Sequence, residues 1–284
     1  MNGSHPGTPF WVPSAALQRH LNRTATGRDE CDWLTHVRAA HLPARVPRTL
    51  VIGCGHGFLE RALARYEGIG EILATDGDPA SLEAAAKAAQ HEGFASIRHA
   101  RWEPGSEALP GTGWSFIIAH DVLHHVPALD PLLRSIRGAL APGGRFVFYE
   151  YTGPPRFQHG EAAMELVDRY FRVLPDRIRT DPRTGRILWR RERADAARLE
   201  RENPHEAATD ALLPLARRLF GVDAELSGGE GLLHPLLAGL ESGFRPGSAE
   251  DERLLDVLCA AEARATSLRM LSPLFTIFVG RRPA

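Results

Sequence analysis

The chain of 284 residues is 43% hydrophobic and carries 34 Lys and Arg residues against 35 Asp and Glu residues, a formal net charge of −1. This balance is typical of a globular protein and gives no electrostatic footprint for nucleic acid. No apolar run is long enough to span a membrane, and residues 1–10 lack the charged-then-apolar order of a signal peptide. The three cysteines are scattered, which predicts neither a disulfide framework nor a metal cluster. We therefore expect a cytoplasmic protein with no nucleic-acid or membrane partner.

Residues 1–47 precede the first predicted strand, and their apolar residues are spaced for one or two short helices. Pro43 and Pro47 then mark the entry to the strand. Such a segment would pack on the edge of a sheet.

A glycine-rich turn follows the first strand. Residues 50–52 are apolar and mostly β-branched, which predicts a buried strand. Gly53, Gly55 and Gly57 then recur at every second position before an amphipathic helix. Glycine allows a sharp turn and close approach of a ligand, and the first N–H groups of the helix point at the same gap. The stretch predicts a cradle for a polar small molecule.

The spacing of these glycines differs from the dinucleotide fingerprint. A nicotinamide-dependent oxidoreductase would carry a third glycine or alanine at position 58. That position is Phe58, and the third glycine comes one residue early, at Gly57. Nicotinamide chemistry is therefore the less favoured alternative.

The second predicted strand, within residues 71–76, ends in an acid. Asp76 follows the glycine turn by about twenty residues, where a carboxylate accepts hydrogen bonds from ribose hydroxyls. Asp78 is a rival acid, but Pro79 suits the first position of a helix over 79–91, which predicts that Asp78 caps it.

The alternation of strands and helices continues through the middle of the chain. Further strands are predicted at 96–102, 114–120 and 145–151, with a helix over 130–140 capped by Asp130. Strands separated by helices pair in parallel with right-handed crossovers. We expect an α/β fold with a doubly wound sheet.

From Thr152 the alternation stops for about seventy residues. This segment is charged and helical in character, and residues 203–206 form a capping-box pattern. Residues 186–202 mix both signs of charge, which favours a solvated helical face over a phosphate-binding patch. The remaining predicted elements are a strand at 222–226, helices over 228–240 and 250–268, and a strand at 274–279.

Four motifs in this order resemble the class I S-adenosylmethionine-dependent methyltransferases. They are Val51 to Gly57, Asp76, the run 114–126 and the run 140–148. The resemblance covers roughly residues 45–152. It implies S-adenosylmethionine as the cofactor and methyl transfer to an oxygen, nitrogen or carbon atom of a small molecule. Residues 150–158 resemble a signature of sugar and natural-product pathways.

The resemblance also implies a layout for the chain. The fold would be a doubly wound, mostly parallel, seven-stranded sheet whose last strand is antiparallel. Residues 1–47 would form an N-terminal helical segment, and residues 48–151 with 222–284 the Rossmann-like cofactor domain. In the resembled family, N-terminal helices often close over the bound substrate, which makes Trp11 and His20 candidate contacts as an alternative to packing on the sheet edge. Residues 152–221 would form a helical lid inserted after strand five.

Ligands of open α/β sheets bind beyond the carboxyl ends of the strands. By the resemblance, Asp76 holds the ribose, Glu103 faces the adenine amino group, and His120 and Asp121 contact the methionine end. Trp102 either stacks on the adenine or belongs to the core. The full set of expected cofactor contacts is Gly53, Cys54, Gly55, Gly57, Asp76, Gly77, Trp102, Glu103, His120 and Asp121.

Methyl transfer needs alignment of the reacting atoms and, for some acceptors, removal of a proton. Glu150 is the first catalytic candidate, because an acid that ends a buried strand is costly unless it is used or paired. Its alternative is a structural carboxylate held by neighbouring N–H groups or by Arg156. Tyr151, His120 and His159 follow as candidates.

A metal is not expected. His124 and His125 are adjacent, so their side chains point apart and do not easily chelate one ion. Besides a methyltransferase, the sequence leaves open a module that binds the cofactor without transferring a methyl group.

Overall fold

The computed structural model describes residues 14–105, 108–126, 128–202 and 210–283. The chain forms two compact units, which we call the helical unit and the sheet unit. The helical unit comprises Met1–Trp33, Gly153–Asn203 and Ser227–Phe275, and the sheet unit comprises Leu34–Thr152, Pro204–Leu226 and Thr276–Ala284. The predicted Trp11 contact and the capping box at 203–206 lie outside the described residues.

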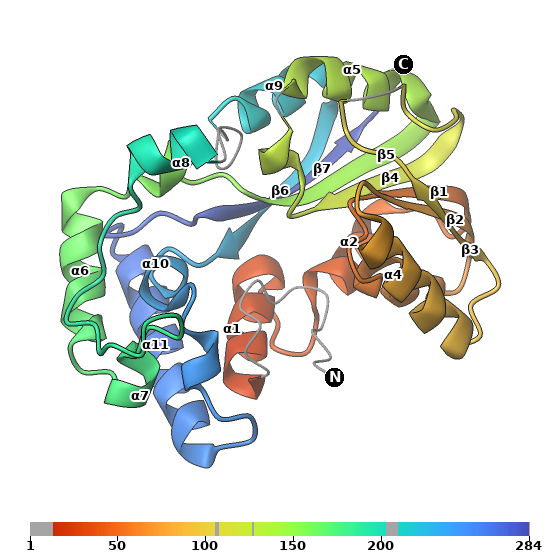
Figure 1. The fold of residues 1–284 in the computed structure, drawn as a ribbon. Coiled ribbons are helices and arrows are strands. Elements are labelled where there is room, and N and C mark those ends of the chain that lie inside the picture. Colours follow the sequence, from red (N-terminus) through yellow and green to blue (C-terminus); the bar gives the residue numbers. More distant parts are fainter. Residues whose placement is uncertain (1–13, 106–107, 127, 203–209, 284) are drawn as a thin grey trace. The chain divides into compact units, whose positions relative to one another are not determined.

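Seven strands form one sheet in the order β3-β2-β1-β4-β5-β7-β6, as Figure 1 shows. The pairs β1–β2, β1–β4, β2–β3 and β4–β5 are parallel. Their bounds are β1 Val46–Ile52, β2 Ile69–Asp76, β3 Ile97–Arg101, β4 Trp114–His120, β5 Leu140–Tyr151, β6 Gly221–Gly229 and β7 Phe275–Arg281. This confirms the predicted α/β fold with a doubly wound sheet.

The last strand runs against its neighbours. Arg282 N donates to Gly144 O near the start of β5, and the hydroxyl groups of Thr276 and Thr152 share a hydrogen bond near its end. The paired residue numbers increase along β7 while they decrease along β5, which means that the two strands are antiparallel. The predicted antiparallel final strand is therefore confirmed.

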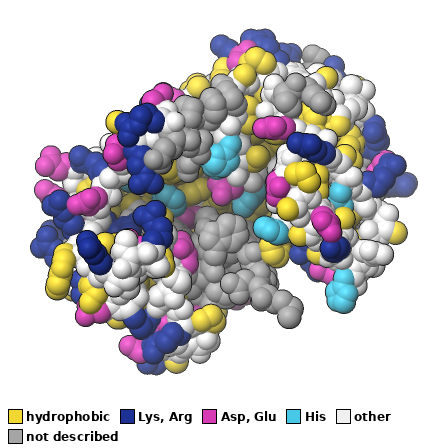
Figure 2. All heavy atoms as spheres, in the orientation of Figure 1, with side chains coloured by type: hydrophobic (Ala, Val, Ile, Leu, Met, Phe, Trp, Pro, Cys, Tyr) yellow, Lys and Arg dark blue, Asp and Glu magenta, His cyan; other side chains and the backbone are white. Residues whose placement is uncertain are grey.

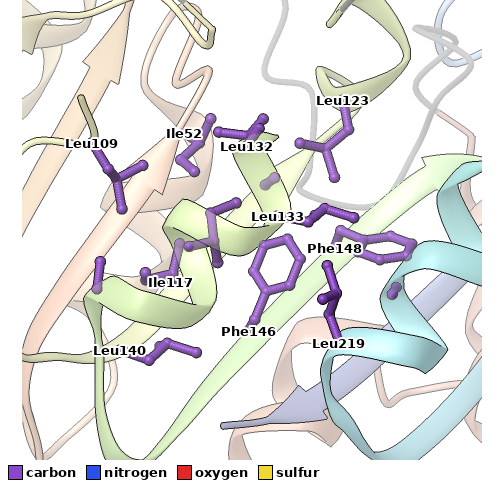
Figure 3. Close-up of a cluster of buried hydrophobic side chains, with 14 of the residues drawn as sticks. Ile52, Leu109, Ile117, Leu123, Leu132, Leu133, Leu140, Phe146, Phe148 and Leu219 are labelled. Atoms are coloured by element: carbon purple, nitrogen blue, oxygen red, sulfur yellow. The ribbon is translucent and has the colours of Figure 1, made fainter. Parts of the chain in front are cut away.

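Helix α5 of the sheet unit (Leu129–Ala139) buries an apolar stripe. In α5, this stripe is Leu129, Leu132, Leu133 and Ile136. In Figure 3, Leu133 lies beside Phe146 and Phe148 of β5, and Leu132 lies beside Ile52 of β1. All five belong to one buried cluster that also contains Leu219 of α9. The α-helices described in this unit are α3 Phe58–Ala64, α4 Pro79–His91, α5 Leu129–Ala139 and α9 Leu212–Leu219, together with α2 Trp33–His41, whose first residue belongs to the helical unit.

The two predicted helix caps have opposite outcomes. The Asp78 carboxylate accepts from the N–H groups of Ala80 and Ser81 at the start of α4, as predicted. The Asp130 cap is wrong, because α5 begins one residue earlier, at Leu129. Asp130 instead pairs with Arg134 on the helix surface.

The helical unit has its own core. It contains α1 Ala15–Thr26, α6 Glu161–Phe171, α7 Asp176–Arg179, α8 Ala196–Glu202, α10 Leu233–Leu237 and α11 Ala249–Ser267. Buried side chains of α1, α6, α10 and α11 form one cluster, which includes Leu17, Val167, Leu236 and Leu258. The predicted insert at 152–221 is mostly helical, but its role as a lid stays a prediction. The units divide the chain differently from the predicted domains, since residues 227–275 group with α6 to α8.

The helix predicted at 228–240 is much shorter than expected. β6 continues to Gly229, and α10 covers only Leu233–Leu237. The intervening turn has Gly229 and Glu230 at positive φ, which a helix excludes.

The described surface is mixed in charge. Figure 2 shows basic and acidic side chains interspersed over the visible face. Within the described ranges, we find no helix with the length and apolar character needed to cross a membrane.

Candidate functional site

The turn after β1 has the geometry that its glycines predict. Gly53, Gly55 and Gly57 have φ values of 68°, 51° and 82°. A Cβ atom on Gly53 would lie 2.5 Å from Cγ2 of Val122, whereas one on Gly55 would meet no described atom within 4 Å. Gly53 therefore lets the turn after β4 pack against the turn after β1, and Gly55 leaves its backbone open to a ligand.

Asp76 ends β2 beside this turn. Its Oδ2 accepts the N–H of Gly55 at 2.8 Å, and its Oδ1 accepts the N–H of Asp78 at 2.9 Å. A carboxylate has about four acceptor positions, so these two hydrogen bonds orient the group and leave capacity on both oxygens. Asp76 is thus held beside the turn with acceptor capacity left, and its role as the ribose-binding acid stays a prediction.

The rival acid is engaged elsewhere. Asp78 accepts hydrogen bonds from Ser81 Oγ at 2.7 Å and from the N–H groups of Ser81 and Ala80. These hydrogen bonds hold the pKa of the Asp78 carboxyl below its usual range. Asp78 therefore serves the helix start, which leaves Asp76 as the acid at the turn.

The next three expected cofactor contacts, Gly77, Trp102 and Glu103, follow the carboxyl ends of β2 and β3. A Cβ atom on Gly77 would lie 3.5 Å from the Cβ atom of Glu103, so the exposed Glu103 covers this glycine. Trp102 is buried in the core of the sheet unit, and its Nε1 donates to Ala108 O at 3.0 Å. Trp102 is therefore a core residue, which is one of the two alternatives that the sequence left open for it. Its contact with adenine stays a prediction.

The turn after β4 is held by Glu150. This side chain is fully buried, and its Oε1 accepts the N–H groups of Val122 and Leu123, both at 2.6 Å. Its Oε2 lies 2.9 Å from Nδ1 of His124, where an Nδ1–H group donates to it. Asp121, which precedes these donors, has a φ of 53°. Glu150 therefore stabilises a turn with a non-glycine residue in the left-handed region.

The alternative predicted for Glu150, a carboxylate held by N–H groups, is what the structure shows. The Arg156 part of that alternative is wrong, since Arg156 pairs with Glu200. Sequence reasoning missed His124 as a partner, because a separation of 26 positions along the chain hides the contact. The only available signal was that both residues stand at the carboxyl ends of neighbouring strands.

The same cluster has the composition of a metal site. One ligand atom each from Asp121, His124 and Glu150 lies within 4.8 Å of the others. However, both Glu150 oxygens already accept hydrogen bonds, one of them from the His124 nitrogen that would have to coordinate. The absence of a metal stays a prediction.

Burial opposes charge on the other catalytic candidates. It lowers the pKa of His120, whose ring centroid is 5.0 Å from that of Tyr149, and raises the pKa of Tyr151. It also lowers the pKa of His159, which belongs to the helical unit. Burial, with the nearby carboxylates of Glu60 and Asp76, raises the pKa of Cys54, so this residue of the turn stays a neutral thiol.

The sheet unit thus brings the turns after β1 and β4, Asp76 and Glu150 to the carboxyl ends of parallel strands. This sheet order, glycine turn and acid define the class I fold of S-adenosylmethionine-dependent methyltransferases. Residues 50–146 match the family model described as a methyltransferase domain. The chain therefore carries an S-adenosylmethionine-dependent methyltransferase domain, with S-adenosylmethionine as its cofactor.

Two curated relatives each match part of the chain. A trans-aconitate 2-methyltransferase from Methylobacterium radiotolerans is 34% identical over 106 residues, which is 37% of this chain and 38% of that protein. A hybrid PKS-NRPS synthetase from Emericella nidulans is 34% identical over 113 residues, 37% of this chain but 3% of that protein. The chain thus matches well under half the length of either relative.

Among solved structures, the phosphoethanolamine N-methyltransferase 2 of Haemonchus contortus in complex with S-adenosyl-L-methionine has a TM-score of 0.56. It is 15% identical, and the match covers 89% of this chain and 53% of that one. This likeness concerns the fold.

Proposed function

We propose that the chain transfers a methyl group to an oxygen, nitrogen or carbon atom of a small molecule. The observation that carries this proposal is the Asp76 carboxylate, oriented by the N–H of Gly55 at the open glycine turn. When bound, S-adenosylmethionine supplies an activated methyl group. The names of the aconitate and phosphoethanolamine methyltransferases, both enzymes of small molecules, support this acceptor class.

The residues of the β4 and β5 ends have separate roles in this proposal. Glu150 is a positioning residue that fixes the turn from Asp121 to His124. Because Nδ1 of His124 donates to Glu150, its basic nitrogen is Nε2. We assign to Nε2 the removal of a proton from the methyl acceptor, in reactions that require this step. His120 and Tyr151 rank lower because burial disfavours their charged forms.

The acceptor belongs, in this proposal, to secondary metabolism. The support is the 34% identity to a segment of a hybrid PKS-NRPS synthetase, which is an enzyme of natural-product assembly by its name. The insert that follows β5, residues 152–221, is proposed as the acceptor lid that the sequence predicts.

The test is transfer itself. The full chain is incubated with methyl-labelled S-adenosylmethionine and a metabolite extract from a natural-product producer, and the label is followed by mass spectrometry. We expect labelled small molecules together with S-adenosylhomocysteine. Cofactor binding without any transfer of label would instead favour the binding module that the sequence leaves open.

A further inference from the structure

The helical unit contains a cavity of its own, of about 420 Å³. Its walls come from α1, α11 and the end of β6. All its lining residues belong to the helical unit, so the cavity can be considered without the cofactor site.

A buried ion-pairing group forms part of the wall. His20 of α1 and Glu262 of α11 are 8% and 2% exposed, and His20 Nε2 lies 2.9 Å from Glu262 Oε1. Glu262 also accepts the N–H groups of Glu230, Leu232 and Leu233, at 2.8 to 2.9 Å. With two hydrogen bonds on each oxygen, the carboxylate is saturated, so His20 must be the donor in this pair.

The second ring nitrogen of His20 is left for another molecule. Nδ1 makes no hydrogen bond to the described residues, and it is not among the polar atoms sealed from solvent. Since His20 lines the cavity, Nδ1 presents a hydrogen-bonding position to its interior. A ligand in the cavity can therefore hydrogen-bond to Nδ1 in place of water.

Two arginine side chains line the same cavity. Arg19 and Arg23 lie one turn apart on α1 and line it, with side chains 49% and 66% exposed. Their partners are Asp256 and Asp29. A guanidinium has five N–H donors, and these pairs use one donor of Arg19 and two of Arg23, so the remaining N–H groups can bind the carboxylate of a ligand. The small side chains of Ala16, Cys259 and Ala260 complete an apolar wall.

We propose that this cavity binds a small organic acid with a hydrogen-bonding group at its far end. Arg19 and Arg23 bind the carboxylate, the short apolar body lies along the alanines and Cys259, and the polar end meets Nδ1 of His20. The proposal goes beyond methyl transfer and does not depend on it.

The test is calorimetric titration of the full chain with 6-hydroxyhexanoate and, as its neutral match, 6-hydroxyhexanamide. We expect the acid to bind and the amide to bind at least about tenfold more weakly, because it lacks a charge-assisted hydrogen bond. The double variant Arg19→Gln, Arg23→Gln should lose a similar factor. Arg253→Gln, on the exposed face of α11 outside the cavity, should bind like the parent chain.

His20→Gln tests the inner end. Glutamine retains an N–H donor for Glu262 but has no second ring nitrogen, so the preference for 6-hydroxyhexanoate over hexanoate should disappear. Binding of S-adenosylhomocysteine should stay unchanged in all these variants, which separates this proposal from the proposed function. No binding of the acid, equal binding of acid and amide, or equal losses in Arg253→Gln and the double variant would overturn the proposal.

Discussion

Each of the two units contains a buried glutamate whose carboxylate accepts hydrogen bonds from a turn with a non-glycine residue at positive φ. In the sheet unit, Glu150 accepts the N–H groups of Val122 and Leu123, directly after Asp121 at a φ of 53°. In the helical unit, Glu262 accepts the N–H groups of the turn that begins at Glu230, whose φ is 70°.

The two glutamates differ in where their histidine comes from. His124 belongs to the turn that Glu150 holds, whereas His20 lies 242 residues away from Glu262, on α1. The Glu150 cluster is therefore local to one edge of the sheet. The Glu262 cluster joins α1, α11 and the end of β6, so it should contribute more to the stability of its unit than Glu150 does to the sheet unit.

The largest effect is expected for Glu262→Ala. The change leaves buried N–H groups and His20 without their acceptor, so the free energy of unfolding should fall by about 3–5 kcal/mol. Denaturant titration measures this, with Glu250→Ala at the exposed start of the same helix as the control. A loss no larger than that of the control would remove the parallel between the two clusters.

Glu150→Ala is expected to cost less stability, about 2–4 kcal/mol, because fewer buried N–H groups lose their acceptor. Its larger consequence should be on transfer, since the turn of Asp121 and His124 is released. Glu150→Gln keeps an acceptor for Val122 and Leu123, so it should restore most of the stability but not the transfer rate. If both variants keep the parent rate, Glu150 does not position the site.

The features that could be predicted from the sequence are those set by local spacing. The glycine turn, Asp76 and the Asp78 cap depend on spacing within a few residues, and each stands where predicted. Asp130 failed as a cap because α5 begins at Leu129, which places Asp130 inside the first turn, where its carboxylate pairs with Arg134.

The remaining site residues depend on contacts that spacing does not encode. Glu150 could be recognised as a buried acid, but not its donors at Val122 and Leu123. Glu262 stands in a helix rich in both charges, where nothing in the sequence separates a buried glutamate from the exposed ones.

Acid should weaken the helical-unit cluster in a defined range. Burial alone would raise the pKa of Glu262, but hydrogen bonds from His20 and backbone N–H groups, with the charge of His20, lower it below the ordinary 4.5. The unfolded chain therefore binds the proton first, and the stabilisation is present above pH 4.5 and lost as pH falls through the folded-state pKa. The difference in unfolding free energy between the parent chain and Glu262→Gln should shrink below pH 4.5, and a constant difference would contradict this.

The smallest effect, and the most direct test of the central claim, concerns Asp76. Calorimetry of S-adenosylhomocysteine binding to the full chain should show that Asp76→Ala weakens the affinity by about 1–3 kcal/mol, because the ribose hydroxyls lose their acceptor. Asp78→Ala should leave the affinity close to that of the parent chain, since Asp78 serves α4. Equal affinity of the parent chain and Asp76→Ala, or tighter binding of NAD than of S-adenosylhomocysteine, would contradict the cofactor site described for this turn.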